Sequence, residues 1–175
     1  MLAAETAFTI AELMQRLAAR PGSHASFREE KHLAALSAPI ETSGRLLYIR
    51  PSYLEKITLT PAPEQLVVNG DRLTITHAPG QPAQTVDLAS QPAIRALVET
   101  VRGTLSGDLP SLQRYYRVSL AGTARDWQLT LTPTDSTVAR FVREVRIDGS
   151  GADLREVDTV QRNGDSSRML IEPIG

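Results

Sequence analysis

Strand-like patterns fill most of this chain, and they limit its possible folds more than any other feature. Eleven short segments show such patterns, and turn-forming residues separate them. Asn69-Gly70 lies between two of these segments and is among the strongest hairpin signals, because both residues tolerate positive φ. Strands that follow one another through short turns predict an antiparallel meander. The expected strands span residues 24–35, 42–50, 53–60, 65–68, 72–76, 85–88, 115–120, 127–132, 140–148, 154–162 and 167–171.

Two amphipathic helices are expected beside these strands. The first begins after Thr9, which forms a capping box with Glu12, and it ends before Pro21. The second spans residues 92–105 and interrupts the run of strands. Both helices have apolar residues at helical spacing, which are Ile10, Leu13, Met14 and Leu17 in the first and Ile94, Leu97, Val98, Val101 and Leu105 in the second.

A large antiparallel sheet with one apolar face must cover that face. It can close into a barrel, or it can curl into an incomplete barrel with helices over the open side. The second arrangement leaves an apolar space between the sheet and the helices. Such a space can hold a lipid chain, but protein interiors are usually densely packed, which favours filling by side chains.

The composition excludes several kinds of site. The 175 residues include 19 basic and 20 acidic side chains, and a net charge of -1 argues against nucleic-acid binding. The chain has no cysteine, so disulfides, thiolate metal sites and a cysteine nucleophile are excluded. His24, His32 and His77 are too scattered to predict a metal cluster. No apolar run approaches the roughly 20 residues that a membrane-spanning helix needs.

The remaining polar patterns indicate no catalytic site. Residues 29–32 alternate charged side chains along a strand without an accompanying nucleophile, so we expect a solvated strand face. Ser111, Ser166 and Ser167 lie in no nucleophile-elbow sequence. Trp127 is expected in the core. We therefore expect no enzyme activity, no cofactor and no metal site.

Several sequence blocks, taken in order, resemble one known family. An N-terminal helix leads into His24-Ala25-Ser26-Phe27, a Gly-x-Leu strand follows, Arg50-Pro51 begins a turn, and a hairpin with Asn69-Gly70-Asp71 comes next. This order resembles LolA, the periplasmic carrier of outer-membrane lipoproteins, and its superfamily. The chain is identified as a divergent LolA-related member over most of its length. The matching blocks are residues 24–27, 43–46, 48–54 and 66–73, and more weakly 141–149 and 165–168.

The resemblance implies a fold. The family fold is an eleven-stranded incomplete barrel with helices as a lid. We therefore expect a mainly β (α+β) protein in which an eleven-stranded antiparallel incomplete barrel and its helical lid enclose an apolar concavity. Residues 1–175 are expected to form a single domain.

The resemblance also implies a function. The family carries acyl chains of lipoproteins across the periplasm, between an inner-membrane exporter and an outer-membrane acceptor, without catalysis or a cofactor. We expect a periplasmic monomer that binds an acylated lipoprotein or other lipid and shuttles it towards the outer membrane. The alternative is a non-carrier envelope module with a packed interior that recognises a protein partner. Residues 1–4 lack the basic start and apolar stretch of a signal peptide, so no export signal is expected in this sequence.

Individual residues take expected roles from the same resemblance. Arg50 falls on a family arginine whose hydrogen bonds hold the lid shut, so it is the candidate latch, although an ordinary strand-end arginine is an equal alternative. Leu54 falls where the family usually has phenylalanine, near the cavity mouth. The residues expected to line the cavity or contact lipid are Leu46, Tyr48, Leu54, Ile57, Ile94, Leu97, Val98 and Val101.

Overall fold

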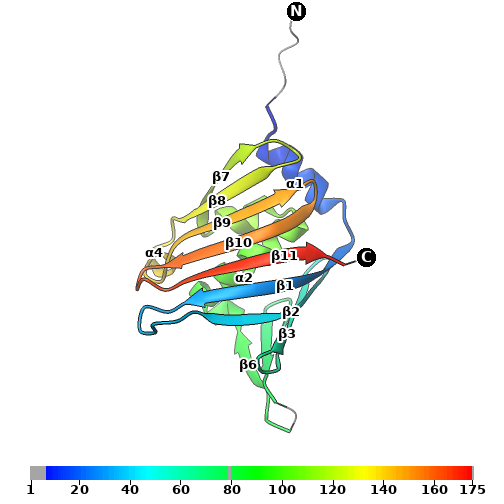
Figure 1. The fold of residues 1–175 in the computed structure, drawn as a ribbon. Helices are drawn as coiled ribbons and strands as arrows, with labels where there is room; N and C mark the ends of the chain where they lie inside the picture. Colours follow the sequence, from blue (N-terminus) through cyan, green and yellow to red (C-terminus); the bar gives the residue numbers. More distant parts are fainter. Residues whose placement is uncertain (1–6, 79, 175) are drawn as a thin grey trace, which may run out of the picture.

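One antiparallel sheet of eleven strands dominates the structure, a computed structural model that describes residues 7–78 and 80–174 (Figure 1). Residues 1–4, where no signal peptide is expected, lie outside the described residues. The sheet is curved and open, as the resemblance to the LolA superfamily predicts. The strands are β1 (Gly22–His32), β2 (Ile40–Ile49), β3 (Tyr53–Thr60), β4 (Glu64–Asn69), β5 (Arg72–Thr76), β6 (Gln84–Asp87), β7 (Tyr116–Gly122), β8 (Trp127–Pro133), β9 (Val142–Ser150), β10 (Asp153–Gln161) and β11 (Ser166–Pro173).

The strand order corrects the expectation of a single meander. The order is β6-β5-β4-β3-β2-β1-β11-β10-β9-β8-β7, so two meanders are joined where β1 pairs with β11. Strands β6 and β7 follow one another in sequence but form the two opposite edges of the sheet. The chain reaches the second edge through the helical segment that lies between β6 and β7 in sequence.

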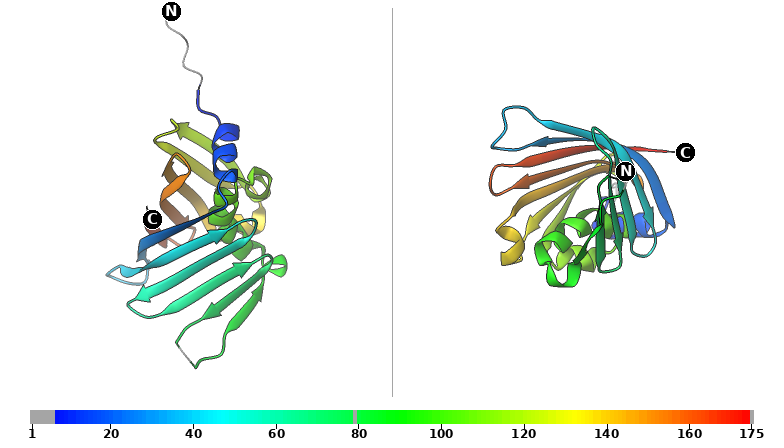
Figure 2. Two further views of the ribbon diagram at one scale, coloured as in Figure 1. Left: turned by 90° about the vertical axis from the view of Figure 1, so that its right-hand side faces the viewer. Right: turned by 90° about the horizontal axis from the view of Figure 1, so that it is seen from below.

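Helices lie on the concave side of the sheet (Figure 2). Helix α1 (Ile10–Ala18) has the predicted capping box, in which the amide of Glu12 donates to Oγ1 of Thr9 at 3.2 Å. Helix α2 (Pro92–Ser106) is the predicted second helix and follows a 3₁₀ turn at Leu88–Ser90. Helix α2 is termed the lid helix below. Two short helices complete the described set, α3 (Leu109–Gln113) and α4 (Ser136–Ala139). Within the described residues, none of the helices combines the length and apolar character needed to cross a bilayer.

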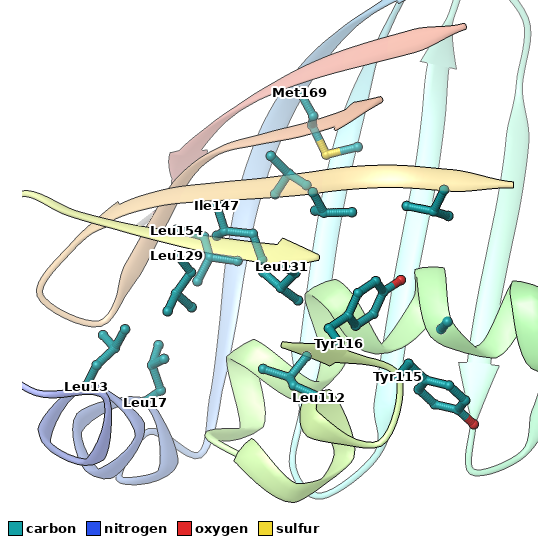
Figure 3. Packing of buried hydrophobic residues seen from close by; sticks show 14 of the residues in the cluster. Leu13, Leu17, Leu112, Tyr115, Tyr116, Leu129, Leu131, Ile147, Leu154 and Met169 are labelled. Atoms are coloured by element: carbon teal, nitrogen blue, oxygen red, sulfur yellow. The ribbon is translucent and has the colours of Figure 1, made fainter. Parts of the chain in front are cut away.

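The hydrophobic core is concentrated in one half of the molecule, between strands β7–β11 and helices α1, α2 and α3 (Figure 3). Leu13 and Leu17 of α1 are fully buried against this half. Trp127 is a core residue as expected, since it is 1% exposed and its Nε1 donates to the carbonyl of Gly151 at 3.0 Å. A second, smaller cluster surrounds Leu88 in the other half, with Val68 and Leu73. The buried apolar residues of the concave side thus form two separate clusters.

Two glycines permit close approaches that shape this concave face. A Cβ on Gly44 would lie 1.8 Å from the carbonyl oxygen of Ile57, at a register shift between β2 and β3. Gly107 ends the lid helix with φ 68°, and a Cβ there would lie 2.3 Å from the carbonyl oxygen of Met14. A side chain at either position would push apart elements that now touch.

Candidate functional site

An apolar cavity of about 490 Å³ lies between the lid helix and the concave face of the sheet. Strand residues form its floor and walls, and the apolar stripe of α2 covers it. Six of the residues predicted to line a cavity do so, because alternation along the strands and helical spacing along α2 aim them at the same space. These six are Leu46, Leu54, Ile94, Leu97, Val98 and Val101.

A second cavity of about 440 Å³ adjoins the first. Leu46, Leu54 and Val101 line both cavities and therefore lie where the two spaces meet. Tyr48, another predicted lining residue, lies in this second cavity. Its side chain is 2% exposed, and burial raises the pKa of the Tyr48 hydroxyl, so the phenol stays neutral. The second cavity is more polar than the first, because Arg20, Ser23, His24 and Asp153 also line it.

The prediction that Ile57 faces the cavity is corrected by strand alternation. Cross-strand partners in a sheet project from the same face. Ile57 pairs with Arg45 and Gln65, whereas the neighbouring Lys56 pairs with the cavity residue Leu46. Ile57 consequently lies on the convex face and lines neither cavity.

Arg50 lies where it can hold the lid helix to the sheet. Its Nη1 donates to the carbonyl of Ser106, in the last turn of α2, at 3.1 Å. The last carbonyls of a helix have no partner within the helix, so a guanidinium satisfies one of them and also interacts favourably with the helix dipole. The contact is solvent-exposed. The residue that the sequence singles out as a latch therefore contacts the predicted lid.

A second arginine, Arg102, extends from the lid helix to the sheet and makes more hydrogen bonds than Arg50. The sequence-based prediction missed it. Arg102 projects from the lid helix and is 5% exposed. Its Nη1 donates to the carbonyl of Gly70 at 2.6 Å and to that of Ser52 at 3.1 Å, in the turns that precede β5 and β3. Its Nε and Nη2 donate to the carboxylate of Glu99, which is 6% exposed. One buried guanidinium therefore joins the lid helix to two turns of the sheet.

Arg95 adds a third contact from the same helix, an ion pair with Asp71 at 3.2 Å. Arg95 near the start of α2, Arg102 in its second half, and Arg50 at its last residue thus connect the helix to the sheet. The helix meets the sheet through apolar contacts over the cavity and through polar contacts to the turns that join β2 to β3 and β4 to β5. Polar contacts of this kind can be exchanged for water when the helix moves, because their donors and acceptors remain hydrogen-bonded in solution.

The cavity also has a polar end, where part of the expected solvated face of residues 29–32 turns inwards. Glu29 is 7% exposed, and its Oε1 lies 3.0 Å from Nζ of Lys56 and 3.7 Å from Nζ of Lys31. The ammonium of Lys56 also lies 5.1 Å from the ring centre of Phe27, a cation–π contact. The expectation of a solvated face is therefore wrong for Glu29, because its position on β1 places it on the concave side.

The convex face has a separate acidic cluster. Carboxylate oxygens of Asp148, Glu156 and Asp158 lie within 4.8 Å of one another. Burial, reinforced by Glu156, raises the pKa of Asp158 to about 7. The guanidinium of Arg168 lies 3.0 Å from Glu156 and balances part of this charge. The cluster is a group of carboxylates that could hold a cation, and it lies on the opposite face from the cavity residue Val157.

The structures of several proteins resemble this one. The LolA superfamily protein NE2245 from Nitrosomonas europaea is 10% identical, with a TM-score of 0.51 over 95% of this chain and 92% of that one. The MucB structure is 17% identical, with a TM-score of 0.50 over 93% of this chain and 56% of that one, so the chain spans little more than half of MucB. A putative outer membrane lipoprotein-sorting protein domain from Vibrio parahaemolyticus is 11% identical, with a TM-score of 0.49 over 93% of this chain and 88% of that one. At these identities, the first two similarities show a shared fold.

Comparison by sequence gives the family. No match is found among curated proteins. A family model described as outer membrane lipoprotein carrier protein LolA-like matches residues 2–174. This match covers nearly the whole chain, and it agrees with the open eleven-stranded sheet and its helices. The chain therefore belongs to the LolA-like family of outer membrane lipoprotein carrier proteins.

Proposed function

We propose that this protein is a periplasmic carrier that binds the acyl chains of a lipoprotein or other lipid and shuttles its cargo towards the outer membrane. The observation that carries the proposal is the apolar cavity of about 490 Å³ beneath a helix that polar contacts attach to the sheet. Membership of the LolA-like family supports the same function.

Burial of an acyl chain supplies the driving force in this proposal. Each CH₂ group removed from water contributes about 0.8 kcal/mol. The walls offer aliphatic side chains such as Leu54, Leu97 and Val98, whose non-directional contacts suit a flexible chain. Burial of an acyl chain requires no catalytic group, so we propose binding without a reaction.

Entry and release require the lid helix to move. Moving α2 breaks the hydrogen bonds of Arg50 and Arg102 to main-chain carbonyls, and water can replace those bonds. Leu97 and Val101 leave their apolar neighbours during this movement and then pack against the acyl chain. We propose an inner-membrane exporter as the donor of cargo and an outer-membrane protein as its acceptor, with the carrier acting as a monomer of one domain.

Native mass spectrometry of protein purified from a bacterial periplasm tests the proposal directly. We expect a stoichiometric acylated species, which lipid extraction identifies. In parallel, the uncharged dye 1-N-phenylnaphthylamine should gain fluorescence in the cavity, and added lipid should displace it. A clean mass for the protein alone, together with no dye uptake, would contradict the carrier function and favour the non-carrier module with a protein partner.

The role of Arg50 is tested in the same dye assay. Arg50→Leu should leave the circular dichroism spectrum unchanged, because the side chain is exposed and makes one contact with the lid helix. The variant should exchange dye and lipid faster, since one restraint on α2 is removed. Equal exchange rates for both proteins would show that Arg50 is an ordinary strand-end arginine.

A further inference from the structure

Lysines are placed unusually in this protein. Of its 19 basic residues, two are lysines, and both Lys31 and Lys56 line the apolar cavity near its polar end. Lys56 lies on β3 and reaches Glu29, while Lys31 lies near the end of β1 with its side chain 44% exposed. Two ammonium groups beside an apolar cavity are not explained by chain burial alone, because an aliphatic wall would hold an acyl chain as well.

The strand register continues this polar end across the sheet. Lys31 on β1 pairs with Ser167 on β11, and Ser167 pairs with Thr159 on β10. Directly paired residues project from one face, so an ammonium and two hydroxyls form a row on the concave side. The next row along the strands is Glu29, Met169 and Val157, so the lining becomes apolar on β11 and β10, while β1 still carries the carboxylate of Glu29. The cavity therefore changes from polar to apolar along the strand direction.

The charges at this end leave Lys31 available to a ligand. Glu29 is neutralised by Lys56, whose ammonium lies nearer to it than that of Lys31. Asp165 also lines the cavity, but its Oδ1 accepts from the amide of Ala34 at 2.8 Å and its Oδ2 accepts from the side chain of Asn163 at 3.0 Å. Both of its oxygens are thus engaged within the adjoining loops.

We propose that the cavity selects amphiphiles with an anionic head, a carboxylate or a phosphate, which binds Lys31 with help from Ser167 and Thr159. The tail runs past Met169 and Val157 and then beneath the lid helix. Hydrogen bonds from an ammonium to an anionic oxygen are roughly twice as strong as neutral ones, so charge on the head adds affinity to tail burial. This inference rests on the proposed carrier function and names the chemical class of its cargo.

Displacement of 1-N-phenylnaphthylamine by three compounds with the same C16 tail tests the proposal. Hexadecanol has a neutral head, palmitate a carboxylate and monohexadecyl phosphate a phosphate. We expect at least one anionic compound to bind roughly tenfold more tightly than hexadecanol, a factor that corresponds to one good charged contact. The ratio of palmitate to hexadecyl phosphate affinity identifies which head is preferred.

Variants assign that preference to the polar end. Lys31→Gln keeps the buried Glu29–Lys56 pair and should abolish most of the anionic preference, while hexadecanol affinity stays the same. Arg143→Gln removes the same charge at an exposed position of β9 and is the matched control, with no expected effect. The double variant Glu29→Gln/Lys56→Gln removes the buried pair as a unit and tests the contribution of Lys56.

The outcomes separate this inference from the proposed function. If hexadecanol binds and the anionic compounds bind no more tightly, the inference is overturned and the carrier function stands. If the anionic preference survives both Lys31→Gln and the double variant, the assignment to this polar end is overturned. If neither the dye nor any C16 compound binds, the proposed function itself fails.

Discussion

The buried guanidinium of Arg102 gives the sharpest test of how the lid helix is held. The substitution Arg102→Met keeps most of the apolar stem and removes the bonds to the carbonyls of Ser52 and Gly70 and to the carboxylate of Glu99. Loss of one partner of a buried ion pair costs about 3–5 kcal/mol, because the other charge is left buried without compensation. We expect the free energy of unfolding to fall by about 3–5 kcal/mol.

Urea denaturation followed by circular dichroism measures this loss. The double variant Glu99→Gln/Arg102→Met should recover part of the stability, since no unpaired carboxylate remains. Arg117→Met, at an exposed position of β7, is the control and should change the free energy of unfolding by less than about 0.5 kcal/mol. A loss of less than about 1 kcal/mol in the single variant would refute the stabilising role assigned to the buried Arg102 network. Equal losses in the single and double variants would refute the part assigned to Glu99.

Three further predictions concern other parts of the fold. Gly44→Ala should lower the free energy of unfolding by about 1–3 kcal/mol or more in urea melts, because a Cβ there would collide with the main chain of β3; an unchanged midpoint would contradict this. Asp158 has a pKa of about 7, against an ordinary 3.8, so its contribution to stability falls as pH rises from about 4 to 7. Asp158→Asn should therefore raise the melting temperature more at pH 8 than at pH 5, and equal gains would disprove the shift. Arg95→Gln should cost less than about 1 kcal/mol in urea melts, because Asp71 is well exposed; a larger loss would give this pair a structural role.

Local patterns predicted the elements well but could not predict their order in the sheet. The expected strands at 53–60 and 72–76 coincide with β3 and β5, because alternation and the Asn69-Gly70 turn are properties of neighbouring residues. The pairing of β1 with β11 depends on residues at opposite ends of the described chain. No local pattern records such a pairing, so the sequence predicted a meander where the structure has two meanders joined at the centre.

Local patterns also predicted the candidate site only in part. The apolar stripe of α2 identified Leu97 and Val101 from helical spacing, whereas Ile57 and Leu54 lie three positions apart on a strand and so face opposite sides. Arg102 was missed because a charged residue on a helix is usually solvated. Its position four residues after Val98, on the apolar side of the helix, was the available signal.

The central β1–β11 pair also governs when the sheet can form. Ser26 and Glu172 are neighbours in this pair although 146 positions separate them in sequence. Proteins dominated by such distant contacts fold slowly, because a long loop must close before the contact contributes. Until β11 is available, β1 presents an unpaired edge that another chain can add to. A chain that lacks β11 therefore keeps the edge of β1 exposed to such additions.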